Sequence, residues 1–237
     1  ATSAVLMLVF KDTITGLAAG VRLTSNDMLH KGDWITVKSV DANGIVEDMS
    51  LTTVKVRNFD NTIVTISPIT LVNGSFQNWI GMQKSGGRRV KRVVYFDFRS
   101  VRLVDETLKR NLLAKHFATE DSFKLKESLQ KAIDKDIQEG KDIEDLKNPA
   151  ALAPTNLQLY RKFMEKYLRQ RPEVNTDLTL MVRHMEATQC GLPIEFYFFI
   201  KDKVWVNYEH ILADIMEHAY ALANEFGLKI YEQYPEQ

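Results

Sequence analysis

Residues 44–66 read GIVEDMSLTTVKVRNFDNTIVTI and lead on to Asn78-Trp79, and this stretch decides the fold. β-branched residues dominate it, and Phe59-Asp60-Asn61 interrupts it with residues that favour turns. The pattern predicts three short β segments with one tight turn at residues 59–61.

The stretch belongs to a larger β module that we place at residues 25–81. A further β-rich run lies at residues 34–37, and Asp41-Ala-Asn-Gly44 is predicted to be a hairpin turn in which Asn43 and Gly44 supply positive φ. Short strands at this spacing predict a small, curved, barrel-like sheet that is too small for a ligand cavity. The tryptophans of the chain flank or lie within strands and are interpreted as core residues: Trp34, Trp79 and Trp205.

Composition excludes several classes of function. Lys+Arg and Asp+Glu are equal at 31 each, so no net charge draws the chain toward nucleic acid or anionic lipid. The single cysteine, Cys190, excludes an intrachain disulfide framework. The sequence contains no zinc-protease, nucleophile-elbow, phosphate-loop or dinucleotide-binding motif, so we expect no enzyme and no cofactor.

The N-terminus reads as a helix over residues 1–23, broken or bent near Lys11-Asp12. Its apolar run, residues 1–10, is shorter than the roughly 20 residues that span a bilayer, and it looks like an element cut in the middle. Gly16 and Gly20 have the small-xxx-small spacing that lets helices approach closely. The same glycines also fit a soluble helix that tolerates them, and the segment alone does not separate the two interpretations.

The second half of the chain reads as a ferredoxin-like domain. Strands are predicted at residues 90–98, 177–186, 193–201 and 228–231, with helices at 105–115, 121–140, 157–169 and 208–226. Their order is β-α-(insert)-β-β-α-β, with a helical insert at about residues 115–153. The predicted fold class is therefore α+β: an N-terminal helix, a small barrel-type β domain and an α/β domain.

Two clusters of side chains are candidate sites. His210, Asp214 and His218 recur every fourth residue on one predicted helix, but they fall where a solvated face belongs, so we expect no metal site. The second cluster holds four basic residues within five positions: Arg88, Arg89, Lys91 and Arg92. These charges fit a solvated strand entry, the lining of an ion route, or contact with phosphate or nucleic acid.

Three stretches of the chain resemble one family, in that family's order. They are Phe10-Lys-Asp-Thr-Ile-Thr-Gly-Leu-Ala-Ala-Gly20, then residues 32–79, and finally residues 172–183 with 191–195, 208–209 and 214–215. Together they resemble the small-conductance mechanosensitive (MscS) channels, and within them the YbdG-type miniconductance branch. The resemblance implies the end of a pore-lining helix with an amphipathic half-helix at residues 1–24, a β-domain at 25–84 and an α/β vestibule domain at 85–237.

The resemblance also implies roles for individual residues. The pore constriction would fall on Ala4 and Leu8, which share a helix face. Lys11-Asp12 would form the bend, and the packing surface of the half-helix would comprise Gly16, Ala19 and Gly20. The chain would form a homo-oligomer, most simply a heptamer.

The same resemblance implies where and how the protein would work. Membrane lipid and permeating ions would be its partners, with no nucleic acid, in the bacterial inner membrane, where it would release solutes under hypoosmotic shock. The alternative from another class is a soluble oligomeric scaffold, or a nucleic-acid-binding protein, built on an Sm-like β module.

Overall fold

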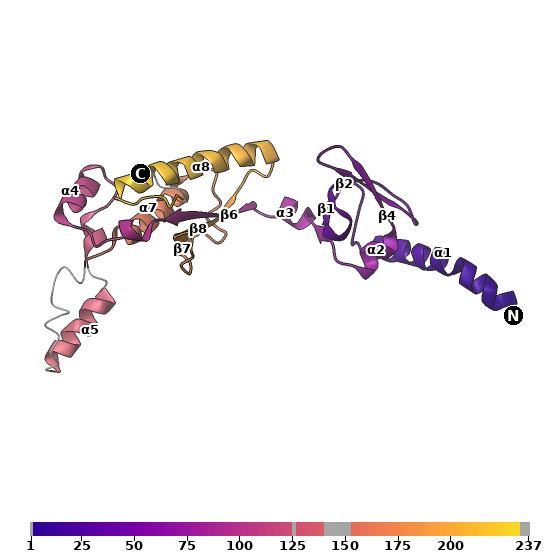
Figure 1. Cartoon of the computed structure of the whole chain (residues 1–237), viewed down its shortest axis with the longest axis horizontal. Coiled ribbons are helices and arrows are strands. Elements are labelled where there is room, and N and C mark those ends of the chain that lie inside the picture. Colours follow the sequence, from indigo (N-terminus) through magenta and orange to yellow (C-terminus); the bar gives the residue numbers. More distant parts are fainter. Residues whose placement is uncertain (1, 125–126, 140–152, 233–237) are drawn as a thin grey trace. The chain divides into compact units, whose positions relative to one another are not determined.

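The computed structural model describes residues 2–124, 127–139 and 153–232 (Figure 1). The chain divides between Ser85 and Gly86 into two compact units, each with its own hydrophobic core. This division falls within Ser85-Gly86-Gly87, where small residues give the backbone freedom.

The N-terminal unit combines one long helix with a five-stranded sheet. Its elements are α1 (Thr2–Ser25), β1 (Trp34–Val37), a 3-10 turn (Lys38–Val40), β2 (Ala42–Met49), β3 (Val54–Asn58), β4 (Ile63–Ile66), α2 (Pro68–Asn73), β5 (Gln77–Asn78) and α3 (Ile80–Lys84). All pairings in the sheet are antiparallel, in the order β4-β3-β2-β1-β5. Because β4 and β5 are its two edges, the predicted barrel-like sheet is open and does not form a closed barrel.

Alternation along the strands builds the core of this unit. One face of the sheet buries Ile35, Val37, Val46, Val54 and Val56 against other apolar residues, and its outer face is polar or half-buried. The two-residue period that identified the strands in the sequence therefore also places their buried face.

The turns of the sheet were predicted with mixed success. The tight turn at residues 59–61 is present: Asn61 has φ 68°, and its N–H donates to the Asn58 carbonyl at 3.0 Å. The hairpin at residues 41–44 is different, because Asp41 (φ 52°) takes the left-handed conformation while Asn43 and Gly44 lie within β2. A Cβ on Gly44 would lie 1.9 Å from the Arg57 carbonyl oxygen, so the glycine serves close strand approach.

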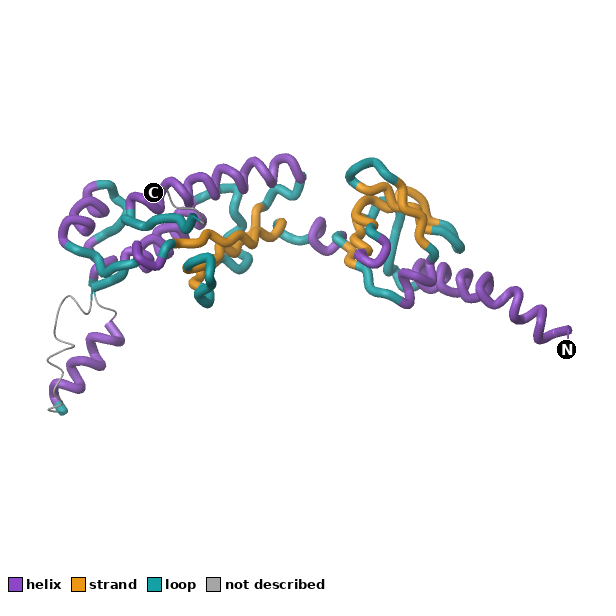
Figure 2. Tube along the Cα trace, in the orientation of Figure 1, coloured by secondary structure: helices purple, strands orange, loops and turns teal. Residues whose placement is uncertain are grey.

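The C-terminal unit is a three-stranded antiparallel sheet packed against helices (Figure 2). Its elements are β6 (Arg88–Phe96), a 3-10 turn (Phe98–Ser100), α4 (Glu106–Ala114), a 3-10 turn (Glu120–Phe123), α5 (Glu127–Gln138), α7 (Asn156–Gln170), β7 (Met181–His184), β8 (Leu192–Ile200) and α8 (Trp205–Glu225). The strand order is β6-β8-β7, and the buried side chains of α7 and α8 share one core with alternate residues of the strands.

The strand predicted at residues 228–231 is reduced to a single bridge, Phe96↔Ile230. Two flanking hydrogen bonds hold it on the free edge of β6: Asp97 N–H to the Lys229 carbonyl (2.9 Å) and Tyr231 N–H to the Tyr95 carbonyl (2.8 Å). With this segment, the chain follows the β-α-β-β-α-β order of a ferredoxin-like domain. The mixed helix-and-sheet fold class is confirmed.

Helix boundaries follow local capping chemistry. The Thr155 hydroxyl accepts from Gln158 N–H and starts α7, and Gly227 (φ 68°) follows the end of α8. The helix predicted at residues 121–140 begins only at Glu127. Parts of the predicted insert, residues 125–126 and 140–152, lie outside the described residues.

Candidate functional site

Helix α1 runs from Thr2 to Ser25 without interruption, so the predicted break near Lys11-Asp12 is absent, and the alternative, a bend there, stays a prediction. Lys11 is exposed, and the side chain of Asp12 is outside the described residues. The predicted constriction residues, Ala4 and Leu8, belong to this helix, but their side chains also lie outside the described part. Their role therefore stays a prediction.

The described half of α1 exposes an apolar stripe that the sequence analysis missed. Its members and their exposed fractions are Phe10 (52%), Ile14 (61%), Leu17 (43%) and Val21 (51%). Spacings of four, three and four residues place all four on one side of the helix. The i, i+4, i+7, i+11 pattern was readable in the sequence, and it indicates a face that packs against another apolar surface.

A second face of α1 packs within its own unit. Ala19 is 4% exposed and Leu23 is fully buried, and a Cβ on Gly20 would lie 2.2 Å from the Leu51 carbonyl oxygen. Gly20 therefore lets the helix approach the backbone between β2 and β3; the predicted packing of Gly16, Ala19 and Gly20 against a neighbouring helix stays a prediction. A Cβ on Gly16 would meet no atom within 4 Å.

The packing face and the apolar stripe point in different directions. At 3.6 residues per turn, the centre of the Ala19–Gly20–Leu23 face lies about 140° around the axis from the centre of the stripe. The helix is thus fixed to the sheet on one side and leaves the other side available to a further apolar surface.

The segment after α1 is fastened to the sheet by a buried carboxylate. Asp33 is 6% exposed and accepts hydrogen bonds from His30 N–H (3.0 Å) and from Asn78 Nδ2 (2.8 Å). Asn78 Nδ2 also donates to the Met28 carbonyl at 3.3 Å. Because a hydrogen bond to a buried carboxylate is costly to lose, displacement of α1 is resisted at β5 as well as at Leu51.

Three aromatic rings form a pad on the outer face of the same sheet. Trp34 stacks on Trp79 with ring centroids 4.7 Å apart, and Phe59 meets Trp34 edge-on at 5.3 Å. Trp79 Nε1 donates to Thr36 Oγ1, and Asn43 Oδ1 accepts from both Thr36 Oγ1 and Trp34 Nε1, each at 3.0 Å. Trp34 and Trp79 are half-buried in this pad and Trp205 is 52% exposed, so the interpretation of all three as core residues is wrong.

The four basic residues of β6 do not form one patch, because alternate residues of a strand face opposite ways. Arg88 lies over the ring of Tyr208 in α8, with its guanidinium carbon 4.4 Å from the ring centroid, and Arg92 lines the same side of the strand beside Glu209. Burial raises the pKa of the Tyr208 phenol, although the positive charge of Arg88 opposes this.

The other two basic residues lie on the opposite face of β6. Arg89 approaches the Tyr197 ring at 5.9 Å, and Lys91 Nζ lies 3.6 Å from Glu195 Oε1. Glu195 is fully buried and also accepts from Arg183 Nε at 2.6 Å. Lys91 is thus occupied in an ion pair across the sheet, and the arrangement divides the charges proposed to line an ion route between two faces.

On α8, the residues that were candidates for a metal site make other contacts. The His218 ring stacks on Tyr167 at 5.8 Å, and its Nδ1 lies 2.7 Å from the Asp214 carbonyl oxygen. Within residues 2–124, 127–139 and 153–232, no three His, Cys, Asp or Glu side chains are grouped to hold a metal ion. Among the helices that the structure describes, none has the length and apolar character needed to cross a membrane.

The N-terminal unit is similar to a domain of known proteins. Residues 12–81 match the family model described as "Mechanosensitive ion channel, beta-domain". The small-conductance mechanosensitive channel MscMJ of Methanocaldococcus jannaschii is 33% identical over 73 residues, which is 31% of this chain and 20% of that protein. An uncharacterized MscS family protein of Aquifex aeolicus is 33% identical over 111 residues, 46% of this chain and 29% of that protein.

Solved structures extend the likeness to both units at the level of fold. The structure of Arabidopsis thaliana MSL1 covers 98% of this chain and is itself covered to 63%, with a TM-score of 0.63 and 10% identity. The closed state of Helicobacter pylori MscS covers all of this chain and is covered to 69%, with a TM-score of 0.59 and 12% identity. The chain spans less than a third of the length of the two sequence relatives, and the relative with a functional name is a channel, not an enzyme.

Proposed function

We propose that this chain, which belongs to the MscS family of mechanosensitive channels, supplies the end of a pore helix and the cytoplasmic vestibule of a tension-gated channel. The β-domain match carries the proposal, and the exposed stripe of α1 supports it. A helix that is anchored on one face and apolar on the other suits packing against membrane or against equivalent helices around a pore.

Covering the apolar stripe of α1 would contribute substantial free energy to assembly. Phe10, Ile14, Leu17 and Val21 are each about half exposed, so covering them would contribute roughly 3–6 kcal/mol per subunit. Such a contribution favours assembly of several copies, and we propose a ring, most simply a homo-heptamer. In this ring Gly16, which has open space around it, is the glycine available for contact with a neighbouring copy.

Tension would act on this assembly by favouring the state of larger membrane area, which shifts an existing closed–open equilibrium. Ala4 and Leu8 would form a hydrophobic constriction that closes by dewetting. The contacts of Gly20 with Leu51 and of Asp33 with Asn78 would transmit movement of α1 to the β-domain. Lys11-Asp12 would then be the bend, formed without breaking the helix.

The proposal also covers the branch of the family, the membrane location, the partners and the physiological role. These are the YbdG-type branch, a place in the bacterial inner membrane with lipid and permeating ions as partners, and release of ions and small solutes during hypoosmotic shock. The resemblance of residues 172–183 and 191–195 to that branch motivates the first. The charges of β6 would bias ions locally at most, since they occupy two faces of the strand.

Patch-clamp recording of the membrane protein that contains this chain tests the proposal. Leu8→Ser should lower the tension at which the channel opens, because a hydroxyl in the constriction favours wetting. Leu6→Ser is the matched control, since Leu6 lies on nearly the opposite side of the helix. An unchanged threshold and conductance in Leu8→Ser would remove Leu8 from the constriction, and a parent protein with no tension-activated current would refute the channel function.

Native mass spectrometry of the same membrane protein tests assembly. A ring of identical subunits is expected, with seven the simplest outcome, and Ile14→Asn should weaken it by placing a polar group in the stripe. Thr13→Asn, on an adjacent exposed position, should leave the ring intact. A strict monomer of the parent would contradict the proposed vestibule.

A further inference from the structure

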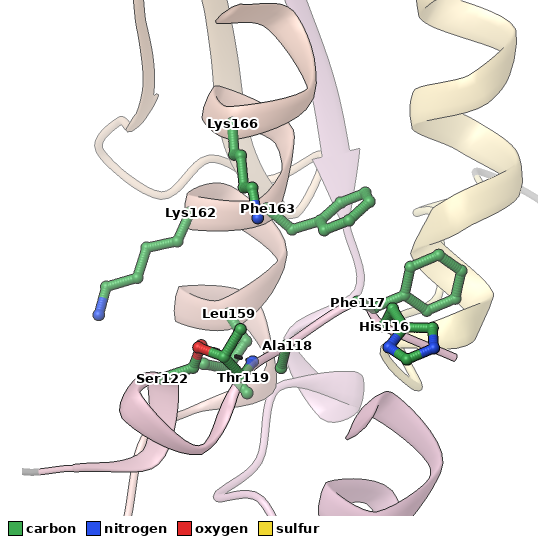
Figure 3. A pocket seen from close by; sticks show the side chains of 9 residues that line it. All are labelled: His116, Phe117, Ala118, Thr119, Ser122, Leu159, Lys162, Phe163 and Lys166. Atoms are coloured by element: carbon green, nitrogen blue, oxygen red, sulfur yellow. Dashed lines mark hydrogen bonds between the residues drawn. The ribbon is translucent and has the colours of Figure 1, made fainter. Parts of the chain in front are cut away.

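The C-terminal unit contains a small cavity where the chain leaves α4 and where α7 passes close by (Figure 3). Its volume is about 150 Å³, which accommodates the phenyl ring of a small ester. Lysines and hydroxyls supply its polar lining, phenyl rings supply much of the rest, and none of its described lining residues is acidic. We propose that this cavity binds a small organic phosphate.

Two ammonium groups define the charge of the cavity. Lys162 and Lys166 are one turn apart on α7 and both line it, and neither forms an ion pair with a described residue. Figure 3 shows both lysines on the helix that also carries Phe163, with Lys166 extending toward that ring. Both lysine side chains are exposed, and no carboxylate is among the described residues that line the cavity, so their charges favour an anion there; lysine is a common phosphate binder.

Hydroxyl groups and phenyl rings complete the complementarity. Thr119 Oγ1 and Ser122 Oγ lie 3.3 Å apart, so one hydroxyl proton serves their mutual bond and the other is available to a phosphate oxygen. Phe117 packs edge-on against Phe163 with centroids 5.2 Å apart, and this pair offers an apolar surface beside the cations. A phosphate ester with a short apolar group matches both halves.

His116, which follows the end of α4, also lines the cavity. It adopts φ 59° at the end of α4, with Phe117 N–H bonded to the Leu112 carbonyl (2.9 Å) and His116 N–H to the Leu113 carbonyl (3.1 Å). This is the hydrogen-bond pattern of a helix end at which glycine is the usual residue. The chain instead places an imidazole there, and that side chain lines the cavity.

Isothermal titration of the 237-residue chain with inorganic phosphate and with phenyl phosphate tests the site. Phenyl phosphate should bind about tenfold more tightly than inorganic phosphate, because only the ester uses the phenyl pair. Lys162→Gln with Lys166→Gln should weaken binding of both probes about tenfold or more. Arg169→Gln, which removes an exposed charge from the same helix outside the cavity, should change neither.

His116→Gly gives a variant whose fold glycine favours at that φ, and it should weaken phenyl phosphate binding about threefold without loss of helix by circular dichroism. Equal weakening by Arg169→Gln and the double lysine variant would show general attraction to charge and overturn the proposal. Equal affinity for the two phosphates, or no binding by the parent, would also overturn it. Because the readout is binding to the chain, none of these results depends on channel activity.

Discussion

The contact between Gly20 and Leu51 gives a sharp test of how α1 is attached to its sheet. Gly20→Ala places a Cβ 2.2 Å from the Leu51 carbonyl oxygen and 2.8 Å from the Leu51 carbonyl carbon and Cα. These are backbone atoms, so relief requires movement of the helix or of the turn between β2 and β3. Gly16→Ala is the matched control, since its Cβ meets nothing within 4 Å.

The two substitutions should change stability in opposite directions. In a helix interior, alanine is favoured over glycine by about 1 kcal/mol, so Gly16→Ala should stabilise the N-terminal unit by about that amount. Gly20→Ala has the same gain, but overpacking against backbone costs up to about 3 kcal/mol, which leaves a net destabilisation of about 2 kcal/mol. For a unit of this size, the expected shifts in Tm are about 4–8 °C upward and about 8–16 °C downward.

Tryptophan fluorescence during thermal and urea unfolding measures both changes. In a Trp205→Phe background the remaining tryptophans, Trp34 and Trp79, both lie in the N-terminal unit, so the signal follows that unit alone. Separate observation matters because two units need not unfold in one step. If Gly20→Ala were as stable as Gly16→Ala, the proposed close attachment of α1 to the Leu51 backbone would be refuted.

Three further predictions concern the C-terminal unit. The side chain of Asn156 is fully buried and makes four hydrogen bonds: its Oδ1 accepts from the N–H groups of Arg102 and Leu157, and its Nδ2 donates to the carbonyls of Ser100 and Phe226. Asn156→Ala should therefore lower the free energy of unfolding by about 3 kcal/mol or more. Asn111→Ala, at an exposed position, should change it little, and equal urea midpoints for the two variants would contradict the prediction. Glu195→Gln should lower the free energy of unfolding by about 2 kcal/mol, which is less than the loss of a fully buried ion pair because Lys91 and Arg183 are half-exposed. Glu186→Gln, at an exposed position, should lower it hardly at all. A negligible effect of Glu195→Gln would show that the ion pairs contribute no stability. Burial raises the pKa of Tyr160 above its ordinary value of 10.0, so the stability that the neutral phenol contributes is complete below pH 10 and is lost as the pH rises through the higher pKa of the folded state. Tyr160→Phe should therefore flatten the decline in Tm at alkaline pH, and an unchanged slope would count against this cause.

The sequence predicted the elements whose cause is local. The turn at residues 59–61 depends on neighbouring residues and is present, and the start of α7 at Thr155 and the Gly227 that follows α8 have equally local causes. The hairpin at residues 41–44 was assigned to the wrong residues because aspartate and asparagine also tolerate the left-handed conformation. Gly44 is needed instead for the approach of Arg57, a contact that only the paired strands reveal.

Residues whose role depends on distant partners were the ones misjudged. Gly20 packs on Leu51, and Asn156 bonds to residues from Ser100 to Phe226, which no local pattern indicates. The division of the β6 charges between two faces follows from strand alternation and could have been derived from the sequence. The stripe from Phe10 to Val21 follows from helix periodicity and could also have been derived from the sequence.

The pairing of β6 with β8 has a consequence for how the protein is made. Residue 88 pairs with residue 200, and the edge of β6 is completed only by residue 230. During synthesis the C-terminal unit therefore cannot close until almost all of the described chain has left the ribosome, and its long-range pairings should make it slow to fold. The N-terminal unit has all its strand partners by residue 78, so it should be complete first, and the nascent chain would carry a finished β-domain while β6 still waits for its neighbour.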